Sequence, residues 1–345
     1  MMQAFKVGQL KDPEGRLITL LPKLIESAIA HENSEKRFEI TIDCGGTPLL
    51  LSAPTDQEFT EIFRDAFIEA SEQVPNFKLV LFESLEPIFL EALNFTDYHG
   101  NLLLRKYLES EKFIAIDRSW NAIYFLDKTR NIGGVWAPNY SQLSLASFIT
   151  PLRTLISWCI DSEGLEVIHA AGVQIEGKGM LLTGPSGSGK STIALYAALQ
   201  GHGILGDDAV IVKKKQMKAL YRNAKIEIDS TQLKIDGKQV KKLAGLGITK
   251  HVLPLENNGF NFLHSAVLHA VILPFIGEVG SYRKMGKIEA IKEFMPQTTK
   301  ELLGGTRHNI ANLFELIETL PFYKLELSSN ASLNLQILID ISRKI

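Results

Sequence analysis

The alternation of hydrophobic and polar positions in the first third of the chain predicts a small α+β fold. The first 30 or so residues have a mixed pattern, which indicates a lead-in with a short helix. Residues 55–74 carry apolar side chains at helical spacing and predict an amphipathic helix. Period-two patterns predict strands at 37–43, 48–53, 77–82, 112–117 and 122–126. Cys44-Gly45-Gly46 favours a hairpin between the first two strands, and the last two are expected to pair.

Turn-forming residues then divide the chain into two expected domains. Gly133-Gly134 and Ala137-Pro138-Asn139 are typical of turns and are taken to end the first domain. The prediction is an α+β domain over 1–138 that recognises a substrate, followed by a catalytic domain over 139–345. A helix over 141–161 is expected to lead into the second domain.

The second part of the chain alternates strands and helices, as α/β folds do. Strands are expected at 166–175, 179–183, 202–205, 209–213, 266–273 and 322–327. Helices are expected at 191–200, 309–319 and the C-terminal run, and a hairpin around Asp236-Gly237.

Composition narrows the classes of protein that this chain can represent. Its 345 residues are 45% hydrophobic and 22% charged, the balance of a globular protein. The net charge of -2 gives no indication of a nucleic-acid or acidic-membrane partner. No apolar run reaches the roughly 20 residues that span a bilayer. Only Cys44 and Cys159 are present, without metal-type spacing, so both are expected to be reduced core residues of a cytoplasmic protein.

One motif points directly to chemistry. The run Gly184-Pro185-Ser186-Gly187-Ser188-Gly189-Lys190-Ser191-Thr192 follows an expected strand and precedes an expected helix. Glycines let successive backbone N–H groups turn toward phosphate oxygens, and the helix directs its positive end there. Lys190 is expected to reach the β- and γ-phosphates and Ser191 to ligate Mg²⁺. The motif therefore predicts binding of a nucleoside triphosphate, taken to be ATP with magnesium.

The surrounding sequence excludes two familiar users of this motif. A transporter ATPase would carry an LSGGQ-like segment and an apolar strand ending in Asp-Glu, and a GTPase would carry Asn-Lys-x-Asp. The sequence has none of these.

Three neighbouring features carry a resemblance to a known family. His169 lies fifteen residues before Gly184, Gly201-His202 closes the helix after the loop, and Asp207-Asp208 follow a short apolar strand. In this order and spacing, residues 165–212 resemble the HPr kinase/phosphorylase family and its HPr-kinase-related members. The resemblance implies a phosphoenolpyruvate-carboxykinase-like P-loop core that phosphorylates a hydroxyl group, in the founding family a serine of a carrier protein. Some related proteins modify natural-product precursor peptides, including lasso peptides. The founding members are hexamers, which leaves a homo-oligomer open here.

The resemblance also implies roles for the neighbouring side chains. The Asp pair supplies the general base and helps to organise the metal, and His169 lies near the transferred phosphoryl group. Phosphoryl transfer needs a carboxylate that accepts the hydroxyl proton, which supports the first role independently. Asp207 is taken as the base and Asp208 as the metal-side residue, with the reverse assignment open. His169 could instead be a core histidine, and His202 a helix-terminal residue.

Other positions depart from the family pattern or remain secondary candidates. The segment 242–248 matches the family's Glu-x-Arg-Gly-x-Gly motif without its acidic and arginine positions. Arg222, Arg283 and Arg307 are candidate guanidinium groups for phosphate late in the chain, and Arg307 is the candidate substrate clamp. Lys213-Lys214-Lys215 is interpreted as a solvated hairpin edge.

These observations favour one function and leave two others open. The leading hypothesis is an ATP- and Mg-dependent kinase acting on a serine or threonine hydroxyl of a peptide or protein, with no nucleic-acid or membrane partner. The alternatives are a small-molecule hydroxyl kinase and a nucleotide-dependent regulatory or binding module without transfer.

Overall fold

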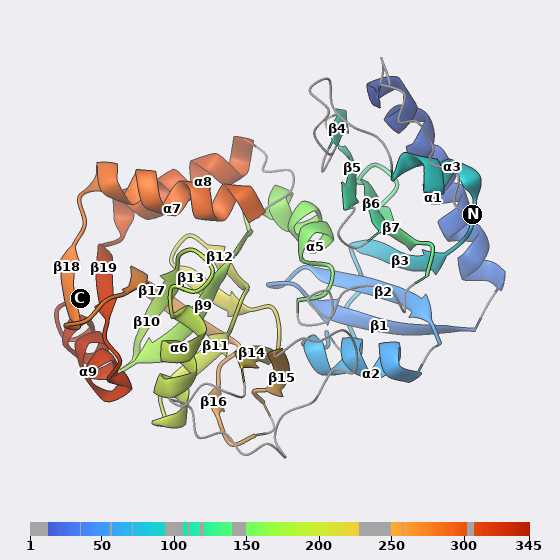
Figure 1. Cartoon of the computed structure of the whole chain (residues 1–345). Helices are drawn as coiled ribbons and strands as arrows, with labels where there is room; N and C mark the ends of the chain where they lie inside the picture. Colours follow the sequence, from blue (N-terminus) through green and yellow to red (C-terminus); the bar gives the residue numbers. More distant parts are fainter. Residues whose placement is uncertain are drawn as a thin grey trace, which may run out of the picture.

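The molecule contains two main β-sheets that lie side by side (Figure 1). The computed structural model describes residues 13–34, 36–55, 57–70, 72–93, 106–109, 111–117, 121–139, 150–227, 250–256, 258–301 and 307–345. The mixed α/β class expected from the sequence is present, and one sheet is formed by the front of the chain and the other by its remainder.

The front sheet has seven strands in the order β1-β2-β3-β7-β6-β5-β4. Their bounds are β1 Arg37–Asp43, β2 Pro48–Pro54, β3 Phe77–Glu83, β4 Lys106–Glu109, β5 Lys112–Asp117, β6 Ala122–Asp127 and β7 Ile132–Ala137. The predicted pairs β1–β2 and β5–β6 are both antiparallel, which confirms the two hairpins. Helices α1 (Pro13–Ser34) and α3 (Pro87–Ala92) pack through apolar side chains on one face of this sheet.

The structure corrects three predictions in the front part. Gly133-Gly134 is not a turn but lies in the middle of β7, where a Cβ on Gly134 would lie 2.0 Å from the Val80 oxygen. These glycines therefore reflect close approach of neighbouring strands rather than a chain reversal. The N-terminal helix has 22 residues and is not short.

Helix α2 (Gln57–Ala66) is also shorter than the expected 55–74. After it, Phe67 and Glu69 form isolated β-bridges to Tyr221 and Ile42, so hydrogen bonds to strands replace further helical turns. Tertiary pairing here overrides a helical hydrophobic pattern.

The second sheet has ten strands and surrounds the candidate site. Its order is β16-β11-β9-β10-β17-β13-β12-β8, and β19 pairs with both β17 and β18. The bounds are β8 Glu166–Ile168, β9 Ala170–Ile175, β10 Lys178–Thr183, β11 Gly203–Gly206, β12 Val210–Lys213, β13 Gln216–Ala219, β16 Asn261–Phe262, β17 Ser265–Ile276, β18 Ser281–Lys284 and β19 Phe322–Leu327. A separate two-stranded sheet joins β14 (Asn223–Glu227) to β15 (Lys250–Pro254).

Helices cover both faces of this sheet. Apolar side chains of α6 (Lys190–Leu199) and α9 (Ala331–Ser342) pack on one face, and those of α7 (Lys287–Glu301) and α8 (Arg307–Thr319) on the other. In this part of the chain, helix α7 and strands β13, β14, β15, β16 and β18 were not predicted. The expected hairpin around Asp236 lies outside the described residues.

The expected single strand 166–175 is divided at His169. β8 pairs with β12, whereas β9 pairs with β10 and β11, so the chain passes from one ladder to another at this residue. A histidine is thereby placed at a break between two strands, where its side chain is not fixed by regular pairing.

Helix α5 (Arg153–Ile160) joins the two sheets. Its apolar side chains belong to one core that contains strands of the front sheet together with Leu165, Val167 and Ile211. Lys218 Nζ donates to the Gly45 oxygen at 2.8 Å, and Arg222 N donates to the Ala66 oxygen at 2.8 Å. Of the predicted helix 141–161, residues 141–149 lie outside the described part, and the boundary at 138/139 stays a prediction. Cys44 and Cys159 are free and buried, as expected.

Candidate functional site

The phosphate-loop motif connects β10 to α6, as the sequence predicted. Gly187 and Gly189 have φ values of 80° and 92°, a left-handed region that side chains other than glycine rarely adopt. Gly189 is also the N-cap of α6, and a Cβ there would lie 2.4 Å from Leu327 Cδ1. The backbone conformation therefore requires glycine at both positions. The loop leads directly into the positive end of a helix.

Two buried side chains give this loop its polar interior. Lys190 is 6% exposed, and its Nζ donates to the Gly184 oxygen at 2.7 Å and to the Pro185 oxygen at 3.0 Å. Ser188 is also 6% exposed, and its hydroxyl has no hydrogen-bond partner among the described residues. A buried hydroxyl without a partner is costly, so this geometry fits a loop that receives an oxygen-rich ligand.

Asp207 follows β11 and points toward the start of α6. Its Oδ1 accepts a hydrogen bond from Ser191 Oγ at 2.8 Å, and its Oδ2 accepts one from Lys225 N at 3.2 Å. The carboxyl is almost fully buried. Burial, together with the neighbouring Asp208 charge, raises the pKa of Asp207 to about 6.

Asp208 lies in a different environment although it is the next residue. Its φ of 73° lies in the left-handed region, which aspartate adopts more readily than most residues other than glycine. Its Oδ1 lies 3.3 Å from His169 Nδ1, and its side chain is 20% exposed. His169 is in turn held at the strand break, because its backbone oxygen accepts a hydrogen bond from Thr183 Oγ1 at 3.2 Å.

Arg153 completes this second cluster and was missed in the sequence. Its Nη1 lies 3.1 Å from His169 Nδ1 and 3.4 Å from the Asp208 backbone oxygen. The preceding residue, Leu152, has a left-handed φ of 60° and is buried. The available signal was one arginine at the start of an otherwise apolar helix, since every residue from Leu155 to Ile160 is buried.

The remaining candidates lie outside this second cluster or cannot be placed. Arg222 donates to Glu256 at 2.9 Å. Arg283 lies on β18, pairs with Glu289, and lines a cleft that also contains Gly184 and Pro185 of the loop. Arg307 is the first residue of α8, and its side chain is not among those described. The whole segment 242–248 lies outside the described residues. His202 follows the end of α6, in keeping with a helix-terminal role, and Lys213 and Lys214 lie at the exposed turn between β12 and β13.

The donor set for a metal is small. The part of the chain that the structure describes contains no group of three or more His, Cys, Asp or Glu side chains arranged around a metal site. Magnesium commonly binds through one or two protein oxygens, with waters and substrate phosphates as the other ligands. Ser191 and Asp207 fit that pattern, because both offer oxygen atoms beside the loop.

Comparison with known proteins places a family resemblance on the same segment. Residues 164–251 match the HPr Serine kinase C-terminal domain. The HPr kinase/phosphorylase of Chlorobaculum tepidum is 49% identical over 47 residues, 14% of each chain. That of Geobacter sulfurreducens is 40% identical over 152 residues, 41% of this chain and 47% of the relative. The matches thus span less than half the length of these relatives.

A solved structure, the Hpr(Ser) kinase/phosphatase from Coxiella burnetii, aligns with 52% of this chain and 96% of its own at 15% identity and a TM-score of 0.29. The resemblance predicted from His169, the loop and the Asp pair is confirmed over the matched residues. In the described part of the chain, no helix is both long and apolar enough to cross a bilayer.

Proposed function

We propose that this protein is an ATP- and Mg-dependent kinase that transfers the γ-phosphoryl group to a serine or threonine hydroxyl of a peptide or protein. The observation that carries the proposal is the division of the site. The Asp207 carboxylate accepts a hydrogen bond from Ser191, the residue after the loop lysine. The Asp208 carboxylate instead lies beside His169, which Arg153 also contacts. The core is proposed to be of the phosphoenolpyruvate-carboxykinase-like kind.

The first half of the site would hold the nucleotide. Backbone N–H groups of the loop and the Ser188 hydroxyl would donate to phosphate oxygens, and Lys190 would bind the β- and γ-phosphates. Ser191 and Asp207 would hold Mg²⁺, which neutralises phosphate charge and polarises the γ-phosphoryl group when bound. In this structure Lys190 Nζ donates to the Gly184 and Pro185 oxygens, and phosphate oxygens would take over these hydrogen bonds.

The second half would activate the acceptor. The acceptor hydroxyl attacks the γ-phosphorus while its proton passes to the Asp208 carboxylate. The bond from that phosphorus to the β,γ-bridging oxygen breaks, and ADP leaves. His169 contacts the Asp208 carboxylate and Arg153 donates to the Asp208 backbone oxygen, so together they would hold Asp208 in position for the proton transfer.

This assignment reverses the order first taken from the sequence. Asp207 is buried and bonded to Ser191, which suits a metal-side residue, whereas the partly exposed Asp208 can meet a substrate. A general base must reach the proton that it accepts, so accessibility favours Asp208. The reverse assignment was left open by the sequence because adjacent carboxylates alone do not reveal their directions.

The test compares Asp207→Asn with Asp208→Asn, using label transfer from γ-labelled ATP and fluorescent-ATP binding in Mg²⁺. We expect Asp208→Asn to retain ATP affinity and lose about 10²–10⁴-fold in transfer rate. Asp207→Asn should weaken Mg-dependent ATP binding itself. Asp340→Asn, on helix α9, is the matched control and should match the wild type. Transfer that is unchanged in Asp208→Asn would contradict the mechanism.

A further inference from the structure

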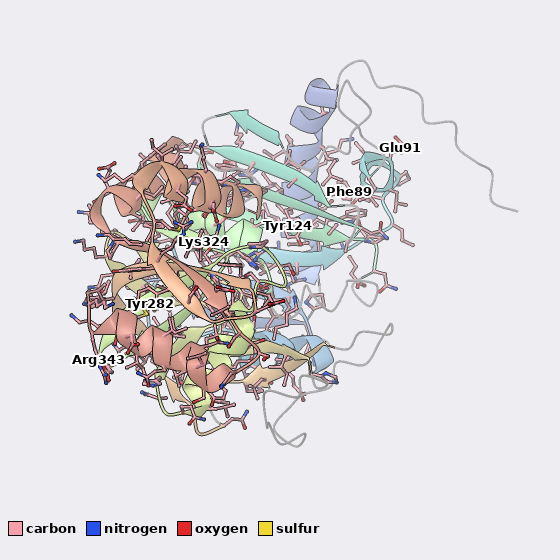
Figure 2. All side chains as sticks on the ribbon, turned by 60° about the vertical axis from the view of Figure 1, so that its left-hand side comes forward. Phe89, Glu91, Tyr124, Tyr282, Lys324 and Arg343 are labelled. Carbon is pink, nitrogen blue, oxygen red and sulfur yellow. The ribbon has the colours of Figure 1, made fainter. Side chains whose placement is uncertain are left out.

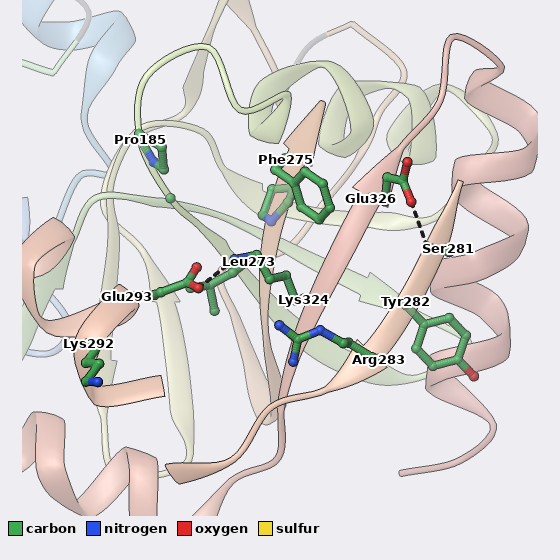
Figure 3. A pocket seen from close by; sticks show the side chains of 12 residues that line it. Pro185, Leu273, Phe275, Ser281, Tyr282, Arg283, Lys292, Glu293, Lys324 and Glu326 are labelled. Carbon is green, nitrogen blue, oxygen red and sulfur yellow. Dashed lines mark hydrogen bonds and ion pairs between the residues drawn. The ribbon is translucent and has the colours of Figure 1, made fainter. Parts of the chain in front are cut away.

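A cleft of about 670 Å³ opens beside the first two residues of the phosphate loop. It lies over strands β17, β18 and β19 and is closed on one side by α7 (Figure 3). Figure 2, turned to bring this side forward, shows Lys324 and Tyr282 on the same side of the molecule. The cleft shares Gly184 and Pro185 with the loop, so the two sites are continuous.

The cleft adjoins the end of the loop where the reactive phosphoryl group would lie. Lys190 Nζ donates to the oxygens of these same residues, Gly184 and Pro185. A loop lysine of this motif binds the β- and γ-phosphates. A ligand in the cleft would therefore lie near the γ-phosphate. His169 is also near this point, because its backbone oxygen accepts a hydrogen bond from Thr183, the residue before Gly184.

The walls of the cleft combine an apolar patch with charges that are mostly compensated. Leu273, Pro274 and Phe275 supply apolar surface, and Phe275 is 40% exposed. Lys324 Nζ pairs with Glu293 Oε1 at 2.5 Å and lies over the Phe275 ring.

Of the other charged groups of the cleft, Arg283 is ion-paired, Glu326 is held by neutral hydrogen-bond donors only, and Lys292 has neither kind of partner among the described residues. Arg283 Nη1 donates to Glu289 Oε2 at 2.8 Å. Glu326 accepts hydrogen bonds from the Ser281 hydroxyl and from two backbone N–H groups. Lys292 is exposed and has no ion-pair partner among the residues that the structure describes. The one cation of the described cleft lining without an anionic partner is thus the ammonium group of Lys292 on α7.

We propose that this cleft binds the segment of an acceptor peptide that flanks the phosphorylated residue. A carboxylate of that segment pairs with Lys292, and an apolar side chain covers Phe275 and Pro274. This inference rests on the proposed kinase function and names its acceptor as a peptide with an acidic flank. His169 lies 3.3 Å from Asp208 and is hydrogen-bonded to Thr183, the residue before Gly184, so one extended peptide would have its acceptor hydroxyl beside Asp208 and its flank in the cleft.

The test uses a synthetic peptide library with one fixed serine and a single flanking position occupied by Glu, Ala or Lys. Transfer from γ-labelled ATP is measured for the wild type and for Lys292→Glu. The wild type should prefer the Glu flank over the Lys flank by about tenfold, as expected for one charge contact beside a binding site. Lys292→Glu should reverse that preference while its KM for ATP stays unchanged. Lys213→Glu, an exposed lysine on the β12–β13 turn, is the matched control and should keep the wild-type preference.

Each other outcome overturns the inference in a distinguishable way. If Lys292→Glu raises the KM for ATP and leaves the flank preference intact, the cleft holds the nucleoside instead. If no peptide is labelled but metabolite extracts accept label in an Asp208-dependent reaction, the acceptor is a small molecule and the kinase function stands. If nothing accepts label, the proposed function fails together with the cleft.

Discussion

The two halves of the candidate site differ in how they are built, although Asp207 and Asp208 are adjacent. The half around Asp207 is mostly local: strand β10, the loop, the start of α6 and the end of β11 lie within 178–207, and Lys225 N, eighteen residues after Asp207, adds one hydrogen bond. The half around Asp208 is assembled from distant segments, because Arg153 comes from α5 and His169 from a strand break. A short motif can specify the first half, whereas the second depends on the packing of the whole fold.

Packing places the second half in contact with the front sheet. Helix α5 carries Arg153 and also packs on that sheet, where Trp158 stacks on Phe113 with ring centroids 5.3 Å apart. The Pro151 oxygen, two residues before Arg153, accepts a hydrogen bond from Tyr221 Oη at 2.7 Å. Changes in the front sheet therefore have a physical route to the Asp208 side that bypasses the phosphate loop.

The largest effect is expected in the local half, from Lys190→Ala. Removing a charge that binds two phosphate groups should weaken ATP binding about 10²–10³-fold, since charge-assisted hydrogen bonds are among the strongest in proteins. Isothermal titration with a non-hydrolysable ATP analogue and Mg²⁺ measures this loss. Lys178→Ala, at the opposite end of β10, is the control and should bind normally. Unchanged affinity in Lys190→Ala would remove the basis for the nucleotide site.

A smaller effect is expected in the assembled half, from Arg153→Met. Loss of the guanidinium should lower kcat about 10–100-fold, as repositioning of a reacting group does, and leave ATP affinity unchanged. Arg153→Lys keeps the charge without the planar fork and should recover only part of the rate.

The control for Arg153 is Arg343→Met, which removes an exposed arginine paired with Glu176. Thermal melts of both variants check that the fold is intact. If Arg153→Met lowers ATP affinity and leaves kcat unchanged, the two halves are not separate as described.

The difference between features made by nearby residues and features made by distant segments also explains what could be predicted from the sequence. The loop, its flanking strand and helix, and the Asp pair were found because each depends on nearby residues. The helix 55–74 was overextended, since Phe67 pairs with Tyr221, a partner 154 positions away that no local pattern reveals. Gly133-Gly134 was taken as a turn because sequence alone does not show that Val80 approaches so closely. Arg153 was missed for the same reason, as its partners lie 16 and 55 residues away.

The smallest predicted effect concerns the stability of the local half. The pKa of Asp207 in the folded protein is about 6, above the roughly 3.9 of an unfolded aspartate. The folded state therefore binds this proton more tightly, and the contribution of Asp207 to the free energy of unfolding should fall as the pH rises from about 4 to 6. Asp207→Asn cannot ionise and avoids this loss. Without Mg²⁺ and ATP, we expect it to be more stable than the wild type by about 1–2 kcal/mol at pH 7.5 and nearly equal at pH 4.

Urea unfolding at the two pH values measures this difference, and saturating Mg-ATP should reverse its sign at pH 7.5. Bound Mg²⁺ would compensate the buried Asp207 charge, so the wild type gains more from the ligand than Asp207→Asn does. A stability difference that is the same at pH 4 and pH 7.5 would contradict the ionisation of a buried Asp207. If the stability difference between the wild type and Asp207→Asn depends on pH but not on Mg-ATP, Asp207 does not bind the metal, and the metal contact is assigned to Asp208.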